Sequence, residues 1–280
     1  MLAVGGIAWS AIFVRWAGIP GTASGFYRVL IAACVLVPWR FARGAAQPFN
    51  RRAALLAVAG GAFFAFDLAL WNTAVLRTQA AMASLLGNNT PIVVGLASWW
   101  IFKQRPSGAF WAGLLLSIAG CIVIVMAEFG RAPASTAHSL SGDVFALTAS
   151  VFFAAYLITT ERIREQMDTL TFNTLAIAGS VITLLIVCLA LGVPLTGYPP
   201  HAWGALVSLG LISQLAAYFA LVYALGHLPA TITSLGLLAQ VPCTALLAML
   251  LLGEPLTGWQ IGGGGLVLCG IYLANRFRAQ

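Results

Sequence analysis

The chain has 280 residues, of which 61% are hydrophobic and only 8% are charged. Soluble domains carry roughly 25% charged residues, so this composition excludes a soluble globular protein. The formal net charge is +7. Because most of the basic residues stand in short segments between apolar runs, membrane topology accounts for this charge and we expect no nucleic-acid partner.

Apolar runs long enough to cross about 30 Å of hydrocarbon predict an all-α polytopic membrane protein with ten transmembrane helices. In chain order the predicted spans are 2–19, 21–39, 53–73, 78–102, 108–127, 142–160, 170–192, 202–225, 230–252 and 259–275. Most are bounded by Gly, Pro or charged residues, and the short hinges make consecutive spans antiparallel neighbours. The first span lacks a basic segment before it, so we interpret it as a retained helix rather than a signal peptide.

The distribution of Lys and Arg predicts the orientation, because cytoplasmic loops retain basic residues. With the N-terminus inside, ten basic residues fall at the cytoplasmic face: Arg40, Arg43, Arg51, Arg52, Lys103, Arg105, Arg162, Arg164, Arg276 and Arg278. Only Arg77 and Arg131 fall outside. Both termini are therefore predicted to be cytoplasmic.

Two stretches about 150 residues apart echo each other at helix breakers and small residues. The recurring residues are Ala74, Ala80, Ser84, Leu85, Pro91, Leu96, Ala97, Gly108, Gly113 and Gly120, which return as Ala224, Ala230, Ser234, Leu235, Pro242, Leu247, Ala248, Gly258, Gly263 and Gly270. Five spans per half is an odd number, so the second half enters the membrane from the opposite side. Lys103 after the fourth span and Glu254 after the ninth follow this change of face. We therefore predict two inverted five-helix repeats, residues 1–139 and 140–280.

With these features the chain resembles the drug/metabolite transporter superfamily, and within it the EamA-type ten-helix exporters. The closest segment is ALGHLPATITSLGLLAQVPCTALLAMLLLGEPLTGWQIGGGGLVLCG, which contains Pro242, Gly253, Glu254 and a glycine-rich last helix. The first half departs from the pattern, with Lys103 where the family often has an acidic residue. Overall the sequence looks most like the YddG-type exporters of aromatic and other neutral amino acids.

The resemblance implies a multi-pass transporter of the bacterial inner membrane that exports small metabolites, amino acids first among them, by alternating access. It places the substrate between the halves near spans 1, 3, 4, 6, 8 and 9. Export of another class, such as a nucleoside, a sugar or a toxic compound, is the alternative. The sequence leaves open whether a proton is coupled and which oligomeric state the protein has, a monomer being one option.

Mid-span prolines predict breaks in two helices. Pro91 and Pro242 each remove a helical hydrogen bond and should leave the carbonyl four residues back, at Gly87 or Leu238, without its usual partner. Three amide side chains stand beside these breaks: Asn88, Asn89 and Gln240. Two interpretations remain open: the amides repair the kinks and join neighbouring helices, or they line a central substrate cavity.

Asp67 is the only acidic residue deep within a predicted span. A carboxylate inside a membrane is by default a functional-site hypothesis with a partner to be named. Arg28 lies at about the same depth in the second span, which predicts an ion pair between them; Arg15 and Arg77 are the alternatives. The pair is either structural, an outer gate, or a contact for a charged substrate group, and Asp67 is the candidate carrier of a coupling proton.

Aromatic residues divide into two groups. Eight tryptophans stand near predicted helix ends, where such rings settle at the headgroup level: Trp16, Trp39, Trp71, Trp99, Trp100, Trp111, Trp203 and Trp259. Trp9, Tyr156 and Tyr218 lie in mid-span instead. With Phe153, Ser213 and Gln214, these three residues are candidates for an apolar pocket that holds a neutral or aromatic amino acid. For Trp9 a packing or lipid-facing role is the alternative.

The remaining motifs indicate packing rather than chemistry. Glycines Gly262–Gly265 in an apolar helix are typical of close helix contact, not of a phosphate site. Five cysteines stand in spans without metal-ligand spacing: Cys34, Cys121, Cys188, Cys243 and Cys269. We expect no metal, no cofactor and no enzymatic activity. An intramembrane enzyme or a channel is less well supported, since the spans show neither converging catalytic groups nor rings of charge.

Overall fold

The structure is a computed structural model that describes residues 2–44, 50–77, 83, 86–101, 103, 105–129, 140–252 and 257–276. Within these ranges every regular element is a helix. In chain order they are α1 (Leu2–Ala8), α2 (Ser10–Ala17), α3 (Gly21–Ala42), α4 (Arg51–Arg77), α6 (Thr90–Trp100), α7 (Gly108–Phe129), α8 (Leu140–Arg164), α9 (Thr169–Ala190), α10 (Pro200–Ser208), the π-helix η1 (Leu209–Ala216), α11 (Ala217–Leu225), α12 (Ala230–Leu237), α13 (Gln240–Leu252) and α14 (Gly258–Arg276).

The helices fall where the apolar runs predict them. Among the described residues, seven segments are long and apolar enough to cross a membrane, while Leu2–Ala17, Thr90–Trp100 and Gly258–Ala274 are apolar but shorter. Several helices run past the predicted ends, as α8 does, because backbone hydrogen bonding continues beyond the hydrocarbon boundary. Seven residues named in the sequence argument lie outside the described part of the chain: Ala80, Ser84, Leu85, Arg131, Gly253, Glu254 and Arg278.

In the described part of the chain, four predicted spans are interrupted rather than continuous; the fourth is broken by a turn at Asn88 and Asn89 before α6. The first is broken at Trp9 between α1 and α2, and the ninth is broken between Leu237 and Gln240. The eighth changes from α- to π-helix over Leu209–Ala216 and back again. The fourth and ninth breaks have a sequence signal, because the rings of Pro91 and Pro242 each clash with a normal helix one turn before them.

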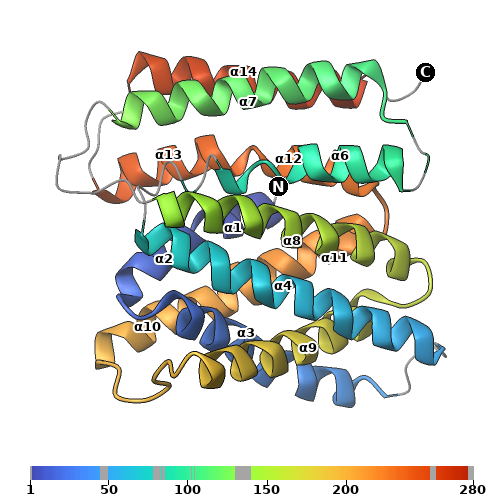
Figure 1. The fold of residues 1–280 in the computed structure, drawn as a ribbon, viewed down its shortest axis with the longest axis vertical. Helices are drawn as coiled ribbons and strands as arrows, with labels where there is room; N and C mark the ends of the chain where they lie inside the picture. Colours follow the sequence, from blue (N-terminus) through green and yellow to red (C-terminus); the bar gives the residue numbers. More distant parts are fainter. Residues whose placement is uncertain are drawn as a thin grey trace.

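Helices α7 and α14 pack side by side at one edge of the molecule (Figure 1) through pairs of glycines. A Cβ atom on Gly120 would lie 2.5 Å from the carbonyl oxygen of Gly263, and one on Gly113 would collide with the carbonyl oxygen of Gly270. The pairing of early with late residues makes the two helices antiparallel. Close packing at the glycine run is thus confirmed for Gly263, whereas Gly262 and Gly265 face open space.

The central core is formed by α3, α4, α8, α9 and α11. Its largest buried side chains include Phe64, Leu157 and Phe172. Helix α4 lies so close to α9 that the Ser180 hydroxyl donates to the Gly61 carbonyl at 2.7 Å. This packing fixes the faces of α3, α4, α8 and α11 that carry the candidate site.

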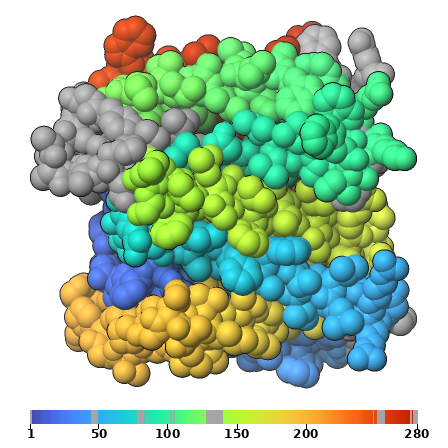
Figure 2. Space-filling view, in the orientation of Figure 1, coloured from blue at the N-terminus to red at the C-terminus, as the bar shows by residue number. Residues whose placement is uncertain are grey.

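The outer surface is rich in large apolar side chains, as a protein embedded in lipid requires. Figure 2 shows one face, on which α7, α6, α8, α4 and α9 follow one another from top to bottom. Exposed residues on α7, α8 and α9 include Leu115, Val151 and Ile186. Six of the eight predicted interfacial tryptophans are exposed, namely Trp16, Trp39, Trp99, Trp100, Trp203 and Trp259, whereas Trp71 and Trp111 are half-buried.

The glycine contacts predict a stability effect that depends on position. Gly120→Ala should destabilise the protein by about 1–3 kcal/mol, because the added methyl meets main chain that cannot move aside. Thermal unfolding in detergent measures it. The matched controls are Gly262→Ala and Gly265→Ala, which lie in the glycine run of the partner helix α14 but face open space. Equal unfolding midpoints for Gly120→Ala and the controls would contradict the packing.

Candidate functional site

The two proline-associated breaks meet inside the molecule. The Nε2 group of Gln240 donates to Oδ1 of Asn88 at 2.7 Å, joining residues 152 positions apart. Asn88 is buried and Gln240 is half-buried, so the bond is largely shielded from the surroundings. The prediction that the amides of the two breaks lie near each other is therefore confirmed for this pair.

The carbonyl groups freed by the prolines both find partners. Gly87 O accepts from the Thr90 hydroxyl at 3.1 Å, and Leu238 O accepts from the backbone N–H of Val241 at 3.1 Å. Asn89 donates through Nδ2 to Leu86 O at 2.9 Å. Asn89 and Thr90 thus repair the break before α6, while Asn88 and Gln240 connect one break to the other.

The two prolines themselves stand inside the helices that restart after the breaks. Pro91 is buried in the first turn of α6. Pro242 is the third residue of α13 and faces α14, where a Cβ on Gly264 would lie 3.3 Å from its ring. Each proline thus sits where a missing N–H costs least, because the first N–H groups of a helix have no intrahelical partner.

The break in the first span turns backbone carbonyls toward the second half of the chain. Gly6 O accepts from the Ser213 hydroxyl at 2.8 Å, and Ala8 O accepts from the Thr244 hydroxyl at 3.3 Å. Trp9 stacks on Phe13 with ring centroids 5.3 Å apart and is half-buried. It packs in a different hydrophobic cluster from the other predicted pocket aromatics.

Four aromatic rings from α4, α8 and α11 form one cluster. Tyr156 lies 6.1 Å from Phe153 and 6.4 Å from Tyr218 between ring centroids. Phe64 completes the cluster at 4.9 Å from Tyr156 and 4.6 Å from Tyr218. The three predicted aromatics therefore come together, and Phe64 is the member that the sequence analysis missed. The sequence spacing could have identified Phe64, because a residue three positions before Asp67 lies on the same face of the helix.

Arg28 joins this cluster to the predicted polar residues of the eighth span. Its Nε donates to Oε1 of Gln214 at 2.7 Å, and its Cζ lies 5.1 Å from the centre of the Tyr218 ring. Only 1% of Arg28 and 3% of Gln214 is exposed. A guanidinium over an aromatic face is favourable, more so when both are desolvated.

The predicted ion pair between Asp67 and Arg28 is not formed as a direct contact. Both side chains are buried and their charges interact electrostatically, yet no nitrogen–oxygen distance within 4.0 Å joins them. The Nε group is directed to Gln214 instead, which η1 brings to the side of α3. The alternative partners are elsewhere: Arg15 is exposed, and Arg77 lies over the ring of Phe145.

The π-helix places Ser213 and Gln214 in the interior together. A π-turn adds a residue to the helical repeat and rotates the following side chains, and such turns are frequent at functional sites. Here Ser213 bonds to α1 and Gln214 to α3, and both side chains are buried. Nothing in the apolar pattern of the eighth span signals this local change.

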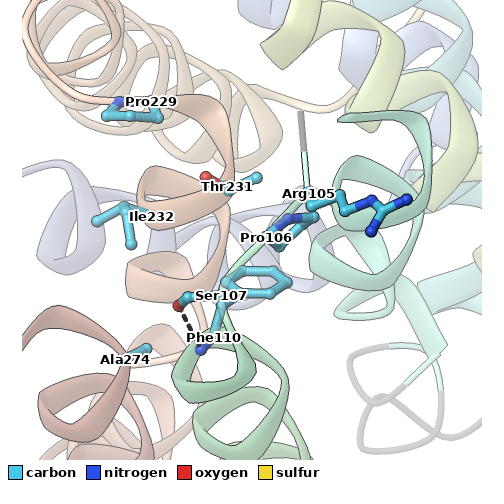
Figure 3. Close-up of a pocket in the computed structure, with 8 residues that line it drawn as sticks. All are labelled: Arg105, Pro106, Ser107, Phe110, Pro229, Thr231, Ile232 and Ala274. Carbon is cyan, nitrogen blue, oxygen red and sulfur yellow. Dashed lines mark hydrogen bonds between the residues drawn. The ribbon is translucent and has the colours of Figure 1, made fainter. Parts of the chain in front are cut away.

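A separate pocket of about 230 Å³ lies between α7, α12 and α14 (Figure 3). It is lined by Arg105, Pro106, Ser107, Phe110, Pro229, Thr231, Ile232 and Ala274, none of them a predicted site residue. Ser107 caps the start of α7 there, its hydroxyl oxygen accepting from the N–H of Phe110 at 3.2 Å. Across the described residues no group of three or more His, Cys, Asp or Glu is placed to hold a metal ion.

Apolar helices long enough to span a membrane, packed around buried polar and aromatic side chains, define a multi-pass membrane protein. The EamA-like transporter family model matches residues 1–126 and again residues 140–276, so the chain belongs to that family and is a membrane transporter.

Relatives agree with this assignment, and a solved structure shares the fold. An uncharacterized transporter of Archaeoglobus fulgidus is 28% identical over 258 residues, 91% of this chain and 88% of the relative. YdfC of Bacillus subtilis, also an uncharacterized transporter, is 25% identical over 245 residues, 88% of this chain and 78% of the relative. A protein of known crystal structure, 19% identical, superposes with a TM-score of 0.78 over 99% of this chain and 96% of its own, and shares the fold.

The bond between the two breaks predicts energetic coupling between Asn88 and Gln240. Each single replacement by Ala should destabilise the protein, and the double replacement should cost less than the sum by about 0.5–1.5 kcal/mol, as for hydrogen bonds between membrane helices. Unfolding in mixed micelles measures the cycle. Asn89→Ala with Gln240→Ala is the control pair and should be additive; coupling of equal size in both pairs would exclude a specific bond.

Proposed function

We propose that the protein exports small metabolites, amino acids first among them, across the bacterial inner membrane by alternating access. The observation that carries this proposal is the buried cluster of Arg28, Gln214 and Tyr218. It places a positive charge and a neutral amide in the interior, at the contact between α3 of the first half and η1 and α11 of the second. Transporter sites are characteristically found at such an interface between repeats.

The two-fold organisation is part of the proposal: residues 1–139 and 140–280 are inverted five-helix repeats. Gly113 and Gly120 correspond to Gly263 and Gly270 in the sequence echo. In the structure Gly113 meets Gly270 and Gly120 meets Gly263. This exchange supports a two-fold axis relating the halves, since such an axis makes each member of one pair contact the counterpart of the other.

The substrate contacts that we propose are the aromatic and polar residues gathered between the halves. Phe153, Tyr156 and Tyr218 supply apolar walls, and Ser213 and Gln214 supply polar groups. Asn88, Asn89 and Gln240 lie at the two proline-associated breaks, and Trp9 lies at the break in the first span. Pro91 and Pro242 act as hinges, because a helix interrupted at a proline can change its angle there.

The amino acid class comes from the resemblance to YddG-type exporters, and the aromatic cluster supports it. Counterflow in proteoliposomes tests this substrate class directly. Vesicles preloaded with an unlabelled amino acid, nucleoside or sugar are offered the same compound in labelled form, and the assay is run with and without a pH gradient. We expect exchange of aromatic and other neutral amino acids above the level of empty liposomes. If another class exchanged and no amino acid did, this substrate assignment would fall while the family would stand.

A matched pair of variants localises the substrate site. Tyr156→Ala should lower the rate of amino acid counterflow by roughly tenfold or more, because it removes a buried wall of the proposed pocket. Tyr272→Ala, on the exposed face of α14, should leave the rate unchanged. Folded yield by size-exclusion chromatography is measured for both. Equal transport by well-folded Tyr156→Ala protein would remove this residue from the site.

Cytoplasmic termini follow from ten spans and the positive-inside rule. Green fluorescent protein fused to either end should fluoresce, and alkaline phosphatase fused to either end should be inactive. A phosphatase fusion after residue 197, in the loop before α10, should be active and serves as the control. Activity at exactly one terminus would instead require an odd number of spans.

A further inference from the structure

Arg28 carries an unused hydrogen-bond donor in the interior. Its Nη2 atom is buried and has no hydrogen-bond partner. Leaving a charged donor unsatisfied in an apolar interior is costly, so such a group calls for a ligand. The rest of the side chain is held in place by Gln214 and Tyr218, which directs the free donor. A guanidinium forms paired, charge-assisted hydrogen bonds with a carboxylate, as it also does with a phosphate.

Asp67 is an acidic residue near Arg28 that also lacks a direct partner among the described residues. Only 8% of the residue is exposed, and no hydrogen bond or ion pair joins it to any other residue in the described ranges. It nevertheless interacts electrostatically with Arg28 across the contact between α3 and α4. Two opposite charges are thus buried in the same region without closing on each other.

The wall that accompanies both charges is aromatic. Phe64 lies one turn before Asp67 on α4, and its ring is 4.6 Å from that of Tyr218, over which Arg28 lies. Tyr156 and Phe153 extend the same cluster. An apolar or aromatic side chain is the part of a ligand that such a surface favours.

We infer that Arg28 and Asp67 select a zwitterion, the Arg28 guanidinium receiving the substrate carboxylate and the Asp67 carboxylate receiving the substrate ammonium. The inference rests on the proposed function and specifies its substrate as an α-amino acid with both charges and an apolar or aromatic side chain. A zwitterion satisfies both buried groups without adding net charge. A ligand with one charge leaves the other group unpaired, which makes its binding much weaker.

Competition among analogues of one amino acid tests this in proteoliposomes containing the full-length protein. Counterflow of labelled L-phenylalanine is measured against unlabelled L-phenylalanine, phenethylamine, which keeps only the ammonium, and 3-phenylpropionate, which keeps only the carboxylate. We expect the two singly charged analogues to compete at least about tenfold more weakly than phenylalanine. Competition by either one within about threefold of phenylalanine would overturn the inference.

Variants assign each charge to its residue. Asp67→Asn should weaken the binding of phenylalanine more than that of 3-phenylpropionate, so the difference in apparent affinity between these two competitors becomes smaller. Arg28→Gln should likewise reduce the difference in apparent affinity between phenylalanine and phenethylamine. Arg15→Gln, an exposed arginine on α2, is the control and should keep the wild-type ranking. If folded Asp67→Asn and Arg28→Gln protein kept the wild-type ranking, the two residues would not be the selectors.

The outcomes distinguish a failure of this inference from a failure of the proposed amino acid export. Amino acid counterflow with no preference for zwitterions overturns the inference and leaves the exporter assignment intact. No amino acid counterflow, with exchange of nucleosides or sugars in the same vesicles, overturns both. Should either variant fail to fold, the analogue ranking of the wild-type protein still decides the inference by itself.

Discussion

A buried guanidinium is the constraint on which the centre of this molecule depends. Moving an ionised group out of water costs several kcal/mol unless neighbouring groups compensate, by the order of magnitude found for buried ions. Arg28 therefore requires an acceptor, an aromatic face and a nearby negative charge, and it obtains them from Gln214, Tyr218 and Asp67. Those groups come from η1, α11 and α4, so one charge ties together elements from distant parts of the chain.

The same rule governs the backbone where helices are interrupted. A carbonyl group without a hydrogen-bond partner is costly in hydrocarbon, though less so than a charge, so interruptions are tolerated only where other groups supply the bond. Hydroxyl groups do most of this here: Thr90 for Gly87, Ser213 for Gly6 and Thr244 for Ala8. Two of these three bonds reach from one half of the chain to the other. The irregular backbone is thereby kept at the contact between the halves.

The helices were predictable because hydropathy depends on composition over some twenty residues, and errors at single positions average out. The meeting of Asn88 with Gln240 was predictable too, because proline leaves a mark in the sequence. The π-helix at Ser213 and Gln214 was not, since its cause lies in tertiary packing rather than in any residue type.

For Arg28, the position along the helix axis could be predicted from the sequence, but the direction in which the side chain points around that axis could not. Equal depth suggested Asp67 as its direct partner, whereas the Nε group turns to Gln214. Phe64 was missed for a similar reason: a phenylalanine in an apolar span is unremarkable until its neighbours are known. Side-chain partners depend on how helices are turned toward each other, and a single sequence does not carry that information.

The glycine contacts between α7 and α14 have a mechanical consequence. Main chain touches main chain at the paired glycines, so no side chain lies between the two backbones there that could move to absorb a displacement. Sliding one helix along the other would drive Ile124 or Val267 into the opposing backbone, since both already border the glycines. Helices α7 and α14 therefore behave as one rigid unit. The movements that carry a substrate through this protein must take place among the other helices, relative to this pair.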